Sequence, residues 1–177
     1  HAVVTALRRL EEQNAAPALV GVVAPEDIYR FYQDYHRHLY RQGIDGVKVD
    51  NQSSLEACTQ GLGGRVRLLR LYHEALEGST QRYFLGNLIN CMSCGTDIIY
   101  QLLNSTLLRT SDDFWPKRPE THGMHLYNNA FASYFTGEFA HADWDMFQSG
   151  HAMGAFHAAA RAISGGPVYV SDTPGGH

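Results

Sequence analysis

Short apolar segments that end on polar residues alternate with helical patterns along this chain, and this alternation most constrains its fold. In the helical patterns, apolar residues recur at intervals of three and four. Strict alternation predicts parallel strands joined by crossover helices, and continuously apolar strands are typical of a sheet covered on both faces. An open doubly wound sheet and a (β/α)₈ barrel both fit this order. The expected strands are at 46–49, 87–92, 106–110, 142–147 and 167–171.

The sequence signals that predict the helices differ in strength. Residues 1–16 have a helical pattern, and Pro25 opens a second helix. Ser53 and Glu56 have the spacing of a capping box before a long pattern that runs to Leu76. Glycines at 61, 63 and 64 interrupt this pattern, where we expect a bend or close packing on a neighbour. The buried stripe of the second helix is predicted to contain Ile28, Phe31, Tyr32, Tyr35 and Leu39. Later helices are expected at 97–103, 124–135 and 151–163.

Polar residues that directly follow the strands favour the barrel. Barrel enzymes build their active sites from the carboxyl ends of several strands at once. A dinucleotide-binding sheet needs a glycine-rich turn after its first strand, whereas the glycines at 61–64 fall within a helical pattern. The residues at the strand ends are Asp50, the Cys91-Met92-Ser93 triplet, Asp112 with Asp113, Asp143 with Asp145, and Ser171 with Asp172.

Carboxylates on separate strands suit glycosidic chemistry. One acid acts as nucleophile or base and the other donates a proton. The candidates are Asp50 and the Asp112/Asp113 pair. Lys48, two residues before Asp50, is expected to help keep it ionised, and Arg109 is close enough in sequence to pair with Asp113. In the weaker alternative, these acids only cap helices and pair with arginine.

Composition and charge restrict the partners. The net charge is −4 and no basic stripe occurs, which argues against nucleic acid. We expect no membrane partner, because the sequence lacks an apolar run of about 18 residues. Three cysteines, a low and odd count, predict reduced thiols and a cytoplasmic protein.

Two further sets of residues have competing interpretations. Cys91-x-x-Cys94 has no second such pair, and the histidines occur without an H-E-x-x-H motif. We therefore predict no metal and no cofactor, and a metal-dependent enzyme remains the weaker alternative. Aromatic residues beside the acids suit stacking on sugar faces, although burial in the core is the more common use. The aromatic residues are Phe114, Trp115, Trp144 and Phe147, and the histidines are His122, His125, His141, His151 and His157.

Seven short strings occur in a fixed order along the chain. They are DGVKVD at 45–50, GLGGRV at 61–66, CMS at 91–93, RxSDDF at 109–114, GEF at 137–139, DWDMF at 143–147 and AAARAISGGPxYVSD at 158–172, where x is any residue. In these strings the chain resembles the raffinose synthase / seed-imbibition-protein group of α-galactosidase-clan glycoside hydrolases. The likeness runs from about residue 25 to the end of the chain.

The resemblance implies a (β/α)₈ TIM barrel with retaining chemistry on α-galactosides. Residues 1–177 would form only its C-terminal part, strands four to eight, so we expect a fragment that lacks the N-terminal strands and accessory β-domains. By the family pattern, Asp50 is the nucleophile and Asp113 the acid/base, with Asp112 as the alternative. The implied substrate-binding residues are Lys48, Arg109, Asp112, Cys91, Trp144 and Asp145, and the seventh strand would also bring Asp143 to the site.

The resemblance leaves the acceptor of the galactosyl group open. With water as acceptor the enzyme is an α-galactosidase acting on raffinose-type oligosaccharides. With galactinol as donor and sucrose as acceptor it is a galactinol–sucrose galactosyltransferase, or raffinose synthase. Asn51 and Gln52, which follow the nucleophile, are more similar to the microbial, hydrolytic branch. We therefore expect hydrolysis, with the transferase as the alternative and a non-catalytic sugar-binding relative as the second alternative.

Overall fold

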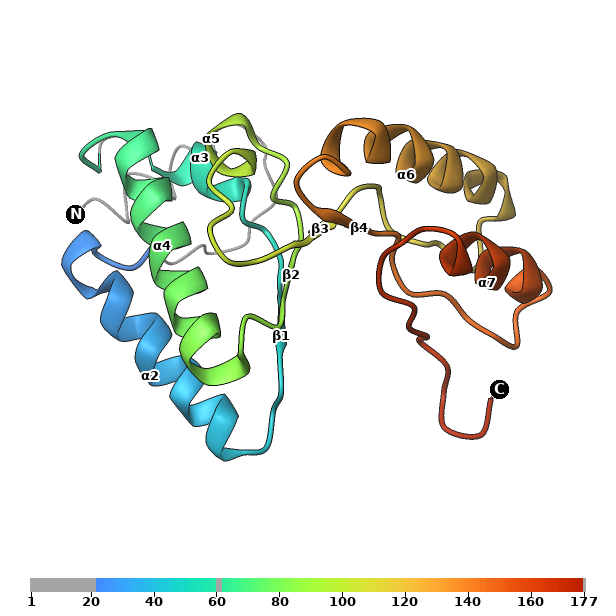
Figure 1. The fold of residues 1–177 in the computed structure, drawn as a ribbon, viewed down its shortest axis with the longest axis horizontal. Coiled ribbons are helices and arrows are strands. Elements are labelled where there is room, and N and C mark those ends of the chain that lie inside the picture. The colour runs from blue at the N-terminus through green and yellow to red at the C-terminus, as the bar shows by residue number, and fades with distance from the viewer. Residues whose placement is uncertain (1–21, 60–61, 177) are drawn as a thin grey trace. The chain divides into compact units, whose positions relative to one another are not determined.

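The computed structural model describes residues 22–59 and 62–176. The helix predicted over residues 1–16 and Gly61 lie outside the described residues. The chain divides into two compact units, His1–Ser105 and Thr106–His177 (Figure 1). Each unit is described by itself.

The first unit combines a parallel strand pair with helices. Strands β1 and β2 pair in parallel, with Val47 opposite Leu88 and Val49 opposite Asn90. A parallel pair needs a crossover connection, and helices α3 and α4 lie between the two strands in the chain. The elements are η1 (Pro25–Asp27), α2 (Ile28–Arg41), β1 (Val47–Val49), α3 (Ser54–Cys58), α4 (Arg65–Phe84), β2 (Leu88–Asn90) and α5 (Thr96–Ile99).

Helices α2 and α4 lie side by side and form the core of this unit (Figure 1). The buried stripe predicted for α2 is partly wrong. Ile28 is fully buried, but Phe31 and Tyr35 are 44% and 51% exposed and stack on each other with ring centroids 6.0 Å apart. The face of α2 toward α4 instead contains His36, whose Nδ1 lies 2.9 Å from Ser79 Oγ. A polar partner on α4 therefore allows a histidine to take a core position.

The long helical pattern after β1 is two helices, not one bent helix. Helix α3 ends at Cys58 and α4 begins at Arg65. Gly63 and Gly64 have φ angles of +90° and +105°, which an α-helix does not contain and which glycine adopts without a Cβ clash. The predicted capping box is also wrong, because the Ser53 side chain makes no capping hydrogen bond to α3.

The second unit repeats the strand-and-helix plan. Strands β3 and β4 pair in parallel, with Leu107 opposite His141 and Arg109 opposite Asp143. The expected last strand, 167–171, is reduced to one parallel bridge between Phe147 and Val170. The elements are β3 (Leu107–Arg109), η2 (Pro119–Thr121), α6 (His122–Thr136), β4 (His141–Asp143) and α7 (Gly154–Ala162).

The predicted α/β class with parallel strands is confirmed in both units. The strand predicted over 142–147 was too long, since regular pairing ends at Asp143 and Asp145 has a φ of +67°, in the left-handed region. The (β/α)₈ barrel stays a prediction. Within residues 22–59 and 62–176, the helices are too short or too polar to cross a bilayer.

Candidate active site

In the first unit, the candidate nucleophile lies directly after β1. Asp50 is exposed, and its Oδ1 accepts a hydrogen bond from the Asn51 N–H at 2.7 Å. Asn51 has a φ of +59°, a conformation that asparagine adopts more readily than most residues. Lys48 is exposed on the same strand, whereas Cys91, after β2, is buried and donates its N–H to the Val49 carbonyl at 2.9 Å. The roles predicted for these residues stay predictions.

Buried side chains fix the backbone next to Asp50. Gln52 Nε2 donates to the Val49 carbonyl at 3.1 Å and to Asn90 Oδ1 at 2.9 Å. Asn90 Nδ2 in turn donates to Ser105 Oγ at 2.8 Å. This chain of amides connects the ends of β1 and β2 to the turn that closes the unit. Nothing in the sequence beyond the position of Gln52 after a strand-end acid indicated this role.

The chain of amides ends on Glu77, a fully buried carboxylate of α4. Its oxygens accept hydrogen bonds from the backbone N–H groups of Leu103, Asn104 and Ser105 and from the Ser105 hydroxyl. His73 Nε2 lies 3.1 Å from Oε1. Burial alone would raise the pKa of Glu77, but hydrogen bonds from His73, Ser105 and the Asn104 N–H outweigh it and lower that pKa below its usual value. Glu77 is therefore ionised and structural.

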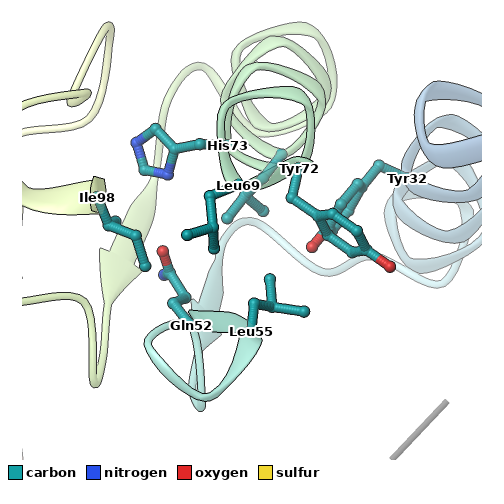
Figure 2. A pocket seen from close by; sticks show the side chains of 8 residues that line it. Tyr32, Gln52, Leu55, Leu69, Tyr72, His73 and Ile98 are labelled. Carbon is teal, nitrogen blue, oxygen red and sulfur yellow. The ribbon is translucent and has the colours of Figure 1, made fainter. Parts of the chain in front are cut away.

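A small cavity lies beside this network (Figure 2). Its volume of about 20 Å³ is enough for about one water molecule, and far below the several hundred Å³ of a ligand pocket. Figure 2 shows the Gln52 amide and the His73 ring among the side chains that line this cavity. It is therefore no sugar site. Its lining residues are Tyr32, Gln52, Leu55, Leu69, Tyr72, His73, Leu76 and Ile98.

In the second unit, Arg109 at the end of β3 connects two carboxylates. Its Nη2 lies 3.0 Å from Asp113 Oδ1 and 2.9 Å from Asp145 Oδ2. The pair predicted between Arg109 and Asp113 is therefore present. Arg109 and Asp145 are buried, but the Asp113 side chain is 69% exposed. The exposed acid is thus fixed by a buried guanidinium that already has a buried counter-ion.

The acids after β4 anchor backbone and neighbouring side chains. Asp145 Oδ2 accepts the Phe114 N–H at 2.8 Å, and the Asp145 N–H donates to Asp143 Oδ1 at 2.9 Å. The Tyr169 hydroxyl lies 2.9 and 3.0 Å from the two carboxylate oxygens of Asp143. Trp144 lies between these two acids in the sequence, and its side chain is buried. Its indole N–H donates to a serine hydroxyl of α6 at 3.4 Å. Substrate contacts by Trp144 and Asp145 stay predictions.

Histidines that are scattered along the sequence gather around Phe114. Ring centroids of His122, His125, His151 and His157 lie 5.0, 6.3, 6.2 and 4.6 Å from the Phe114 centroid. Among the described residues, no three metal-ligating side chains converge on one point, this cluster included. His141, in contrast, is exposed on β4.

Arg161 of α7 lies beside this cluster and was missed by the sequence analysis. It is 1% exposed and donates to the Trp144 and Asp145 carbonyls at 2.8 and 3.1 Å. The alanine-rich sequence around it does not identify its partners. The one signal in the sequence is an arginine within an apolar helix, because a buried arginine requires polar partners.

The sequence is similar to one family of known proteins. The model of the family described as raffinose synthase or seed imbibition protein Sip1 matches residues 2–177. The chain is 49% identical over 159 residues to a probable galactinol–sucrose galactosyltransferase 1 of Arabidopsis thaliana. It is 42% identical over 168 residues to a galactinol–sucrose galactosyltransferase of Pisum sativum, and 37% identical over 170 residues to a stachyose synthase of the same plant.

These matches cover most of this chain but a small part of each relative. They include 89%, 89% and 90% of the chain, and 21%, 21% and 20% of the respective relatives. The chain therefore spans about a fifth of the length of the curated relatives it matches.

Proposed function

The chain belongs to the raffinose synthase or seed imbibition protein family, and on this premise we propose that it carries reacting residues of a galactosyltransferase. The proposed donor is galactinol, and the proposed acceptor is sucrose or a related oligosaccharide. Support comes from the relatives, which are named as galactosyltransferases and a stachyose synthase. They favour the transferase alternative over the α-galactosidase that the sequence led us to expect.

The residues that suggested hydrolysis have structural explanations. Asn51 occupies a left-handed backbone position, and Gln52 is buried with its amide bonded to Val49 and Asn90. The presence of Asn51 and Gln52 is therefore explained by the backbone and by packing, and it does not favour water as the acceptor.

The observation that carries the proposal is the exposed Asp113 carboxylate on buried Arg109. A group that first donates and later accepts a proton must be fixed within hydrogen-bond reach of the reacting oxygen. Arg109 fixes Asp113, and the buried Asp145 carboxylate balances the Arg109 charge. Asp112 is exposed but has no such contact with Arg109 in this unit, so we assign the acid/base role to Asp113.

The proposed reaction has two steps. Asp50 attacks the anomeric carbon of the galactosyl group, the bond to the galactinol oxygen breaks, and Asp113 gives its proton to that oxygen. Asp113 then takes the proton from the acceptor hydroxyl, which attacks the same carbon and releases the Asp50 carboxylate. Two inversions retain the α configuration.

The test supplies galactinol to the intact protein that carries this chain, with and without sucrose, and quantifies raffinose and free galactose. Raffinose formed ahead of galactose supports the proposal. Free galactose that is unaffected by sucrose would identify a hydrolase instead. Neither product would favour a non-catalytic sugar-binding relative.

Variants assign the residue roles within the same assay. We expect Asp113→Asn to reduce raffinose formation by about 10²–10⁴-fold, the usual contribution of a general acid/base. Asp50→Asn should reduce it at least as much, because the covalent intermediate can no longer form. With an activated aryl donor, azide should restore turnover only to Asp113→Asn, because azide attacks the galactosyl enzyme without giving up a proton. Asp112→Asn is the matched control, and a loss equal to that of Asp113→Asn would reverse the assignment.

A further inference from the structure

Imidazole side chains bind the backbone carbonyls of the segment that carries Asp113. We call residues 111–116 the acid/base loop, a name that rests on the proposed function. Three of its carbonyl oxygens lie 2.9 Å from a histidine nitrogen. The pairs are Asp112 with His125 Nδ1, Trp115 with His122 Nε2, and Pro116 with His151 Nε2.

Hydrogen-bond partners determine which nitrogen of each ring carries the proton. A carbonyl oxygen can only accept, so the facing imidazole nitrogen must donate. His151 Nδ1 accepts the Met153 N–H at 3.0 Å, which makes His151 a neutral Nε2–H tautomer. His125 Nε2 lies 3.0 Å from an Arg161 guanidinium nitrogen, which can only donate, and 3.2 Å from the Trp144 carbonyl. That carbonyl already accepts from the same guanidinium nitrogen at 2.8 Å. On the shorter contacts, His125 is the Nδ1–H tautomer, and its Nδ1 donates to the Asp112 carbonyl at 2.9 Å.

Arg161 maintains this protonation state of His125. Besides His125, it donates to His157 Nδ1 at 2.8 Å. Burial, together with the charge of Arg161, lowers the pKa of His125 and lowers that of His157 to about 4. Both rings are thus neutral near neutral pH, and a permanently charged group keeps His125 from turning its donor away from the loop.

The peptide groups on both sides of Asp113 are anchored. The carbonyl before it, of Asp112, accepts from His125, and the N–H after it, of Phe114, donates to Asp145 at 2.8 Å. Both anchors are buried. The backbone of Asp113 is therefore fixed, and its side chain has only its own rotations left, which the contact with Arg109 restricts.

We propose that His125 is a positioning residue, which with Arg161 behind it places the Asp113 carboxyl for proton transfer to and from the sugar oxygen. His122 and His151 hold the C-terminal end of the same loop through its last two carbonyls. General acids act only within hydrogen-bond reach, and a displacement of about 1 Å costs up to 10²-fold in rate. The role predicts a specific defect in proton transfer and not a general loss of activity.

The test compares leaving groups in the intact protein. The inositol oxygen of galactinol needs a proton to leave, whereas 4-nitrophenolate does not. For His125→Leu, we expect kcat/KM with galactinol to fall about 10–100-fold. The pre-steady-state release of 4-nitrophenolate from its α-galactoside should change less than about threefold, because that step is not proton-dependent. His141→Leu, on the exposed side of β4, is the matched control and should change neither rate.

Two further variants separate positioning from folding. His125→Asn keeps an N–H donor near the position of Nδ1 and should restore galactinol turnover to within about fivefold of the unsubstituted protein. In an Asp113→Asn background, His125→Leu should have little additional effect, since the group that it positions is gone.

Equal losses on both donors, or an undiminished loss in the Asp113→Asn background, would overturn the inference and leave the proposed function intact. If the unsubstituted protein transfers no galactose at all, the proposed function fails and the positioning role fails with it.

Discussion

Replacement of Glu77 by glutamine tests whether the buried network supports the first unit. Glutamine keeps the shape of the side chain and one oxygen, which can still accept from the backbone N–H groups of Leu103, Asn104 and Ser105. Its amide nitrogen replaces the oxygen that now accepts from the Ser105 hydroxyl and contacts His73. Glu77→Gln therefore removes the hydrogen bond from Ser105, the contact with His73 and the charge that strengthens the remaining hydrogen bonds.

The cost follows from the burial of this group. A hydrogen bond to a charged group contributes about 1.5–3 kcal/mol and one to a neutral group about 1 kcal/mol. Loss of the Ser105 bond, together with loss of the charge that three backbone N–H groups now face, amounts to about 4 kcal/mol. Few substitutions cost this much unless they disrupt a buried polar network. Since about 1.4 kcal/mol is a factor of ten, the equilibrium for opening this turn should shift roughly a thousandfold.

Hydrogen–deuterium exchange measures that opening directly, because the amides of residues 103–105 themselves bind Glu77. We expect their protection in the intact protein to fall about a thousandfold in Glu77→Gln, with little change in the second unit. Glu74→Gln is the matched control, since Glu74 is on the same helix and its contacts with Arg70 and Tyr29 are exposed. Protection within threefold of the unsubstituted protein, or an equal loss in Glu74→Gln, would refute the reasoning.

Two other predictions concern pH and packing. The pKa values of His36 and His157 are lowered to about 4, mainly by burial, so the unfolded chain binds protons from about pH 6.5 downward and the folded chain does not until about pH 4. Stability should be full above pH 6.5 and fall by about 3 kcal/mol per histidine toward pH 4, and a urea midpoint independent of pH over this range would contradict it. Gly166→Ala should destabilise the second unit by about 1–3 kcal/mol, because its Cβ would overlap the Ala142 carbonyl oxygen. Gly123→Ala, with open space around its Cβ, should show no loss in the same thermal melt.

Local patterns were enough to predict two of the strands, β1 and β3, and their polar ends. The run from Val47 to Val49 and the run from Leu107 to Arg109 are strands, each followed by the acids expected from the sequence. The pair between Arg109 and Asp113 was also predictable, because the two residues lie four positions apart at the end of a strand. In these cases the information lies within a few neighbouring residues.

Features that depend on a distant partner were not predictable. His36 is buried because Ser79 faces it from α4, and no property of its own helix indicates this. The histidines around Phe114 come from separate elements, so their spacing in the sequence conceals the cluster. Arg161 likewise has its partners many residues away. The residues proposed to react were suggested by the sequence, whereas the residues that hold them in place were visible only in the structure.

The two anchored peptide groups beside Asp113 have a practical consequence for visualising substrates. Because His125 and Asp145 bind the backbone and not the Asp113 carboxylate, exchange of the Asp113 side chain should leave the path of the chain unchanged. Under the proposed function, an Asp113→Asn protein should therefore keep its binding surface and consume galactinol slowly enough to be crystallised with it. Such a trapped complex would let crystallographers see the donor and acceptor sugars in place.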